Sequence, residues 1–101
     1  MAQQGPGLAR YSIVKPDGER AQISVQGRDR WALENLARAG VRGCTPIDNP
    51  APRWSAYIWN LRAQGVEIET IHERHEGPYA GTHGRYVLRC AVTRLAEGGD
   101  A

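Results

Sequence analysis

The sequence lacks the long apolar segments that would place it in or across a membrane. No apolar run approaches the roughly 20 residues that a membrane-spanning helix needs. The opening residues, MAQQGPGLAR, contain no apolar leader segment. The chain holds only two cysteines, Cys44 and Cys90, without a CxxC pair. We therefore expect a cytoplasmic protein in which both thiols are reduced and buried as small apolar side chains.

Catalytic and metal-binding motifs are absent as well. There is no GxSxG sequence, and the glycine-rich stretch GPYAGTHG at 77–84 lacks the Gly-Lys-Ser/Thr of a phosphate-binding loop. His72 and His75 have an odd spacing at the end of a predicted strand, which would turn them to opposite faces, and no HExxH accompanies them. We expect neither an enzyme nor a metal site, and no cofactor.

Lysine is scarce among the basic residues. The chain has 13 Lys and Arg residues, of which Lys15 alone is lysine, and the formal net charge is +2. The planar guanidinium of arginine suits phosphate, guanine and carboxylate, although a GC-rich coding sequence would give the same preference. This charge is compatible with an anionic partner without requiring one.

The length of 101 residues, with 41% hydrophobic and 24% charged residues, indicates one ordinary globular domain. We expect that domain over residues 10–94, between disordered tails at 1–9 and 95–101. Two alternating β-branched runs enclose Pro-Asp-Gly and predict a hairpin over 11–25.

Three helices are predicted next, over 28–64 as a whole. The first, 28–39, ends before Gly40. The second, 45–49, begins with Thr45 as its N-cap followed by proline, and is stopped by Asn-Pro. The third, 52–64, opens with proline and ends at a glycine. Its core stripe comprises Trp54, Tyr57, Ile58 and Leu61. Trp31 lies opposite the apolar face of the first helix, so we expect the 11–25 hairpin to cover it.

The sequence pattern of the last part of the domain predicts a β-hairpin over 66–93. Its strands are expected at 66–72 and 85–93, with a glycine-rich loop at 73–84 between them. The order of elements indicates an α+β winged helix-turn-helix: three helices, a C-terminal hairpin that forms the wing, and an additional N-terminal hairpin.

The segments GCTPIDNPAPRWSAYIWNLRAQGVEIET and GPYAGTHGRYVL carry a resemblance to a known family. They resemble the small winged-helix domain proteins of phages, prophages and alphaproteobacteria. The resemblance implies a winged-helix fold. It also implies a DNA-binding protein that acts as a transcriptional regulator or as an accessory factor in DNA metabolism.

Double-stranded DNA is therefore the expected partner, with the third helix in the major groove and the wing near phosphates or the minor groove. The candidate DNA-binding residues share polar or aromatic side chains at exposed positions of these two elements. They are Arg53, Ser55, Trp59, Asn60 and Arg62 on the helix, and Arg74, His75, His83 and Arg85 on the wing.

Trp59 also supports a second hypothesis. It is predicted to face outward between small residues, about 140° from the buried Trp54 on a helix that advances about 100° per residue. Exposed tryptophans are frequent anchors of protein interfaces. The alternative function is thus a winged-helix module that binds another protein, or a second copy of itself, through Trp59.

Overall fold

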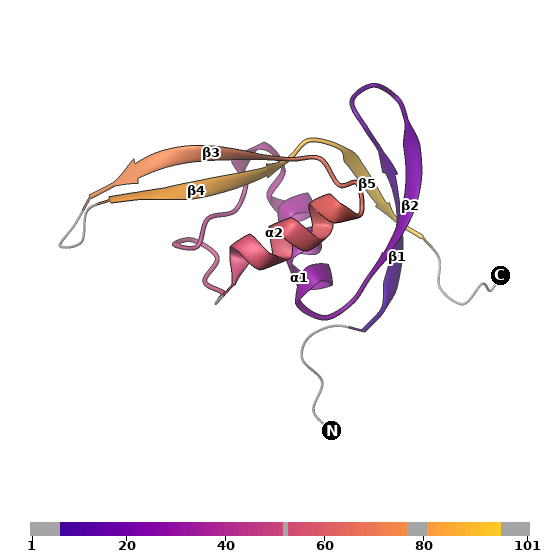
Figure 1. Ribbon diagram of the computed structural model, residues 1–101, viewed down its shortest axis with the longest axis horizontal. Coiled ribbons are helices and arrows are strands. Elements are labelled where there is room, and N and C mark those ends of the chain that lie inside the picture. The colour runs from indigo at the N-terminus through magenta and orange to yellow at the C-terminus, as the bar shows by residue number, and fades with distance from the viewer. Residues whose placement is uncertain (1–6, 52, 77–80, 96–101) are drawn as a thin grey trace.

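The computed structural model describes residues 7–51, 53–76 and 81–95 of the chain. Its elements follow the order β1 (Ala9–Val14), β2 (Arg20–Val25), α1 (Gly27–Ala39), the 3-10 turn η1 (Gly40–Arg42), α2 (Trp54–Ala63), β3 (Ile68–His75), β4 (Gly81–Leu88) and β5 (Ala91–Arg94). The two helices lie between a three-stranded sheet, β2-β1-β5, and the β3–β4 hairpin, which projects away from the body (Figure 1).

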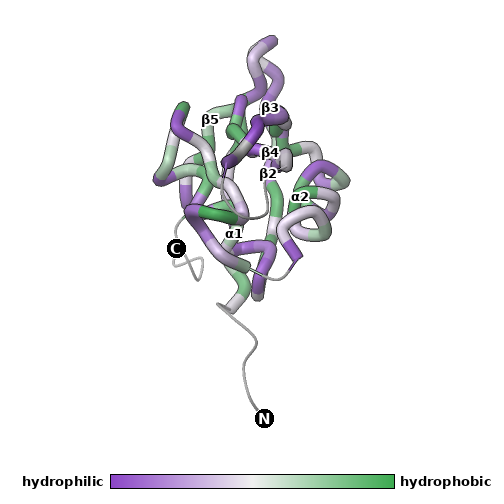
Figure 2. The backbone as a smooth tube through the Cα atoms, turned by 90° about the vertical axis from the view of Figure 1, so that its left-hand side faces the viewer, coloured by the Kyte–Doolittle hydropathy of each residue, from purple (hydrophilic) through white to green (hydrophobic). Residues whose placement is uncertain are grey.

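The N-terminal hairpin is present and is longer than predicted. Strand β1 begins at Ala9 and pairs antiparallel with β2, with Tyr11 opposite Ile23. Ala9, Tyr11, Ile13, Ile23 and Val25 point into the core, and Figure 2 shows how hydrophobic and hydrophilic residues follow the backbone. The expected tails fall largely on residues 1–6 and 96–101, which lie outside the described residues.

The three-stranded sheet is attached to α1 by a partly buried polar contact. The Tyr11 hydroxyl donates a hydrogen bond to Glu34 Oε2 at 2.5 Å, and Arg30 Nε donates to the same oxygen at 2.9 Å. Burial raises the pKa of Tyr11, and the hydrogen bond to Glu34 raises it further. The hydroxyl therefore stays protonated and can act as the donor that its position requires.

Both long helices form as the apolar spacing predicted. In α1, Ala32, Leu33 and Leu36 are buried and Gly40 follows the last turn with φ 61°. In α2 the predicted stripe of Trp54, Tyr57, Ile58 and Leu61 is buried. A positive φ is inexpensive for glycine, which is why the helix ends at that residue.

The predicted helix at 45–49 is wrong, because this segment makes a single turn. Thr45 Oγ1 accepts a hydrogen bond from the Asp48 amide at 2.9 Å, and the Thr45 carbonyl accepts one from the Asn49 amide at 2.8 Å. Thr45 thus caps the turn as expected, but Pro50 cannot continue it. The described part of the chain therefore contains two α-helices rather than three.

The predicted strand at 85–93 is also corrected, because two different sheets share these residues. Strand β4 ends at Leu88, opposite Ile68 at the start of β3. The Arg89 amide donates to the Glu67 carbonyl at 2.8 Å, and the chain then crosses to β1, where Ile13 pairs with Val92. The free edge of β1 decides where β5 forms.

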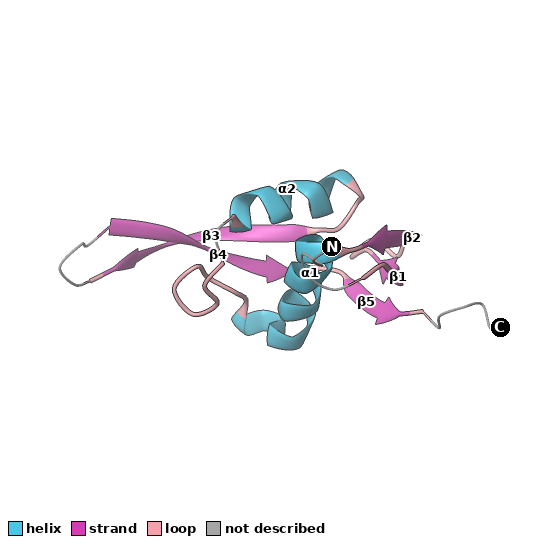
Figure 3. Cartoon of the chain, turned by 90° about the horizontal axis from the view of Figure 1, so that it is seen from below, coloured by secondary structure: helices cyan, strands magenta, loops and turns pink. Residues whose placement is uncertain are grey.

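The wing is a longer hairpin with a shorter connection than the sequence predicts. The expected antiparallel pairing is confirmed, but β3 extends to His75 and β4 begins at Gly81, so most of the predicted 73–84 loop is strand. The connecting residues 77–80 lie outside the described residues. The helices flank the base of this hairpin in Figure 3.

A short bridge holds the segment after α1 against the wing. The Cys44 amide donates to the Tyr86 carbonyl at 2.9 Å, and the Tyr86 amide donates to the Cys44 carbonyl at 2.8 Å. At Gly43, with φ 72°, a Cβ would lie 2.6 Å from the Tyr86 carbonyl oxygen. Only glycine fits this position, for reasons of both conformation and space.

Trp54 joins four parts of the fold. Its ring stacks on Tyr86 of β4 with centroids 5.8 Å apart, and packs on Trp31 of α1 at 5.4 Å and on Tyr57 at 6.3 Å. Its indole Nε1 donates to the Asn49 carbonyl at 2.6 Å. The ring of Trp31 contacts Trp54 and Tyr57 on α2, and its expected contact with the 11–25 hairpin stays a prediction.

Replacing Trp54 with Phe should lower the free energy of unfolding by about 1–3 kcal/mol, because the Asn49 carbonyl loses its donor in a buried site. The matched control is Trp59→Phe, at a side chain that is 74% exposed against 3% for Trp54. That change should stay within about 0.5 kcal/mol. Urea unfolding followed by circular dichroism measures both. Equal losses in the two variants would contradict this assignment.

Candidate nucleic-acid interface

Helix α2 turns one face to the core and three distinct zones to solvent. On the flank toward β3, Arg62 donates from Nε and Nη2 to the Ile68 carbonyl, at 3.3 and 2.7 Å, and from Nη2 to Thr70 Oγ1 at 2.9 Å. On the flank toward α1, Asn60 Nδ2 donates to the Asp29 carboxylate at 3.2 and 3.3 Å. These two contacts fix which side of α2 faces which neighbour.

The outermost line of α2, between these flanks, is apolar. It consists of Ala56, Trp59 and Ala63, which lie at three- and four-residue spacing. The expected exposure of Trp59 is confirmed at 74%. Ala63, Trp59 and the stem of Arg62 line a hollow of about 340 Å³. We call this line of three residues the α2 apex.

The N-terminus of α2 presents a cation. The Arg53 carbonyl accepts hydrogen bonds from the amides of Ala56 and Tyr57, but its side chain is exposed and makes no hydrogen bond or ion pair with the rest of the described chain. The first turn carries no acidic residue and no side-chain cap. The positive end of the helix dipole and the guanidinium therefore lie together in solvent, next to the exposed Ser55.

Strand alternation divides the wing into two faces of different charge. Arg62 contacts Thr70, so the face toward α2 carries Thr70, His72 and Arg74 on β3. Residues directly opposite on β4, which share this face, are Thr82, Gly84 and Tyr86. Both acids of β3, Glu69 and Glu73, lie on the other face. We call the first the α2-side face and the second the far face.

An ion-pair cluster occupies the far face. Glu73 accepts a hydrogen bond from Arg85 Nε at 2.6 Å and lies 3.1 Å from His83 Nε2. Arg85 also donates from Nη1 to the Arg42 carbonyl at 2.8 Å. The hydrogen bond from Arg85 lowers the pKa of the Glu73 carboxyl, and His83 lowers it further. The cluster braces the hairpin against η1.

The structure separates the nine predicted site residues. Six lie on α2 or the α2-side face: Arg53, Ser55, Trp59, Asn60, Arg62 and Arg74. His83 and Arg85 lie on the far face and are bonded to Glu73. The backbone of His75 pairs with Gly81, and its side chain lies outside the described residues. His72 was missed as a site residue, although its position two residues before Arg74 puts both on one strand face.

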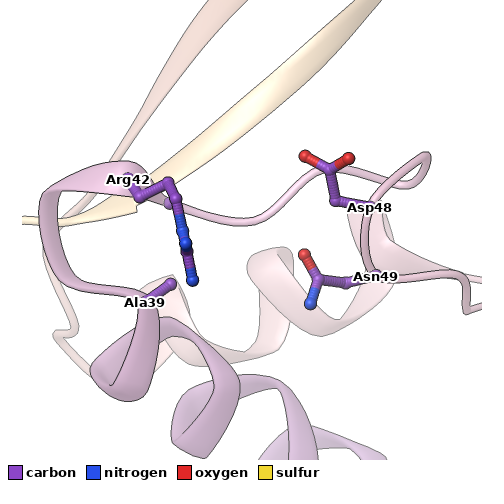
Figure 4. A pocket seen from close by; sticks show the side chains of 5 residues that line it. Ala39, Arg42, Asp48 and Asn49 are labelled. Carbon is purple, nitrogen blue, oxygen red and sulfur yellow. The ribbon is translucent and has the colours of Figure 1, made fainter.

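A second hollow, of about 380 Å³, lies between the end of α1 and the 45–49 turn (Figure 4). Arg42 enters it from one side, and Asp48 and Asn49 line the other. The two opposite charges in one open hollow cancel its attraction for an anion. We therefore do not assign it to the interface.

Three further features of the described residues concern metal ligands, membrane-spanning helices and the cysteines. They contain no group of three or more His, Cys, Asp or Glu side chains that could hold a metal ion. None of their helices is long and apolar enough to cross a membrane. The cysteines are free as expected, Cys44 fully buried and Cys90 partly buried, and burial raises the pKa of both thiols.

The order of a helix, a capped turn, a second helix and a projecting two-stranded wing defines the winged-helix class of proteins. A family model described as a winged helix domain matches residues 22–98. The chain belongs to this family. The matched range begins within β2, so β1 lies outside it. No curated protein and no solved structure matches the chain.

Replacing Arg85 with Gln should return the pKa of Glu73 toward its ordinary value. Pairing with Arg85 lowers the pKa of Glu73 in the folded state. The pair therefore stabilises the wing at pH values above the ordinary pKa of a carboxyl group, and this stabilisation is lost as the pH falls through the lowered pKa. Carboxyl NMR titration measures the change. In Arg89→Gln, which removes the partner of Glu69, the titration of Glu73 should stay as in the wild type; a shift there would argue against this pairing.

Proposed function

We propose that the chain binds double-stranded DNA, with α2 in the major groove and the α2-side face of the wing along the adjacent backbone. The observation that carries this proposal is the distribution of carboxylates. Helix α2 has none, and the paired residues of β3 and β4 have none on the α2-side face, because Glu69 and Glu73 lie on the far face and Glu76 follows the end of β3. Membership of the winged-helix family supports the same conclusion.

Three arginines of this surface are placed to meet phosphates. The side chains of Arg53 and Arg74 are exposed and have no hydrogen-bond or ion-pair partner in the described part of the chain. Arg62 is held by β3 through Nε and Nη2, which leaves Nη1 for an external acceptor. A helix of about 10–12 Å diameter fits a major groove of about 12 Å width.

The biological role that we propose for this binding is regulation of transcription, or an accessory role in DNA metabolism of the phage or prophage type. It rests on the resemblance of the 43–70 and 77–88 segments to such proteins. Binding would need no cofactor, because the cations and the helix terminus are part of the chain.

A second candidate function is protein binding through the α2 apex. The specific observation in its favour is the 74% exposure of Trp59 beside an apolar hollow. A partner protein, or a second copy of the chain, would bury this ring. The two candidates differ in their dependence on salt, because burial of an uncharged indole releases no counterions.

The affinity for a random 20-base-pair duplex should fall with salt at a slope of about −3 in a log–log plot, since each of three phosphate contacts contributes about −0.9. Arg53→Ala and Arg74→Ala should each reduce the slope by about one. Fluorescence anisotropy between 20 and 200 mM salt measures it. These changes remove guanidiniums that make no bond within the described chain, so the fold should persist.

Arg20→Ala is the matched control, because Arg20 is the exposed first residue of β2, and the β1–β2 hairpin lies at the other end of the molecule from the wing (Figure 1). Its slope should equal that of the wild type. Trp59→Ala should also leave the slope unchanged. The DNA-binding proposal fails if no salt-sensitive binding to any duplex is measured at 50 mM salt or below.

A further inference from the structure

The two long polar side chains at exposed positions of α2 are already engaged within the protein. Asn60 is bonded to Asp29, and three hydrogen bonds hold Arg62 on β3. What remains at the outermost line of the helix is the apex of Ala56, Trp59 and Ala63. Apart from the indole N–H, this apex offers a DNA base only apolar contact.

The cations of α2 lie beside the apex rather than on it. Arg62 contacts β3 on one flank. Arg53 is the N-cap residue, directly before the first turn of the helix. A major groove has phosphates along both borders and base edges at its floor. Cations beside an apolar apex suit this arrangement, with the arginines near phosphates and the apex toward the base edges.

One base-edge group in the major groove is apolar: the C5-methyl group of a pyrimidine, which thymine carries and unmodified cytosine lacks. We propose that Trp59 is a specificity residue that recognises pyrimidine C5-methyl groups in the major groove. This inference rests on the proposed DNA binding by α2.

The surroundings of Trp59 suit a methyl group. The hollow of about 340 Å³ beside the ring is lined by Ala63 on one side and by Arg62 on the other. Because β3 holds the Arg62 guanidinium, the aliphatic stem of that residue is fixed as an apolar wall. Ser55 and Ala56, one turn earlier on the helix, are too small to cover the indole.

The test compares duplexes that differ only in methyl groups. An A·T-rich 20-base-pair duplex is measured with thymine and again with deoxyuridine at every thymine position, at one fixed salt concentration. The wild type should bind the deoxyuridine duplex about fourfold more weakly for each methyl that it buries. Trp59→Ala should bind both duplexes alike. Arg53→Ala should bind both more weakly and retain their ratio.

A second arm identifies the source of the methyl group. A G·C-rich duplex is compared with the same duplex carrying 5-methylcytosine. A gain in affinity that Trp59→Ala abolishes supports recognition of the methyl on either base. A loss with deoxyuridine but no gain with 5-methylcytosine supports recognition of thymine alone.

Four outcomes would overturn the inference. Salt-sensitive duplex binding without any methyl dependence rejects it and leaves the proposed function standing, with Trp59 then assigned to a protein partner. A methyl dependence that persists in Trp59→Ala shows that another residue recognises the methyl group. If the protein binds a single strand more tightly than the duplex and Trp59 fluorescence is quenched, Trp59 stacks on bases rather than contacting methyl groups. The absence of all duplex binding rejects both proposals.

Discussion

The packing of Trp54 is the contact on which the rest of the structure depends. Its ring lies against Trp31 of α1 and Tyr86 of β4, and its indole N–H holds the carbonyl of Asn49. One side chain therefore positions the helix that carries it relative to the first helix, the intervening turn and the wing. The outward direction of the α2 apex follows from this packing, since the opposite face of the helix is fixed.

A second constraint is the pairing register of the wing. Because side chains alternate along a strand, the register that pairs Glu73 with His83 turns Arg74 and His72 to the opposite face. A slip of one residue would exchange the two faces and place the carboxylates beside α2. The ion pair of Glu73 with Arg85 stabilises the observed register. This cluster lies away from the proposed interface, yet it keeps Glu73 off the α2-side face and so maintains the positive charge of that face.

The sequence predicted those elements whose evidence is local. The core stripe of α2, the N-terminal hairpin and the exposure of Trp59 each follow from spacing along a single segment. The break after Leu88 could not be predicted, because it depends on the free edge of β1, which lies far away in the sequence. The hydrogen bonds of the candidate site residues Arg85 and Asn60 within the protein could not be predicted either, because they join segments that lie far apart in the sequence.

The same contacts that stabilise α2 limit how it can read DNA. Arg62 anchors the helix to β3, and Asn60 anchors it to α1, so two side chains with the chemistry for base recognition serve to hold the helix in place. Trp59 is 74% exposed, so its indole contributes little to the stability of the folded chain. The Trp59→Phe variant is accordingly expected to be as stable as the wild type. A rigid helix with cations beside an apolar apex favours affinity from phosphates and discrimination from shape and methyl contact rather than from hydrogen bonds to bases.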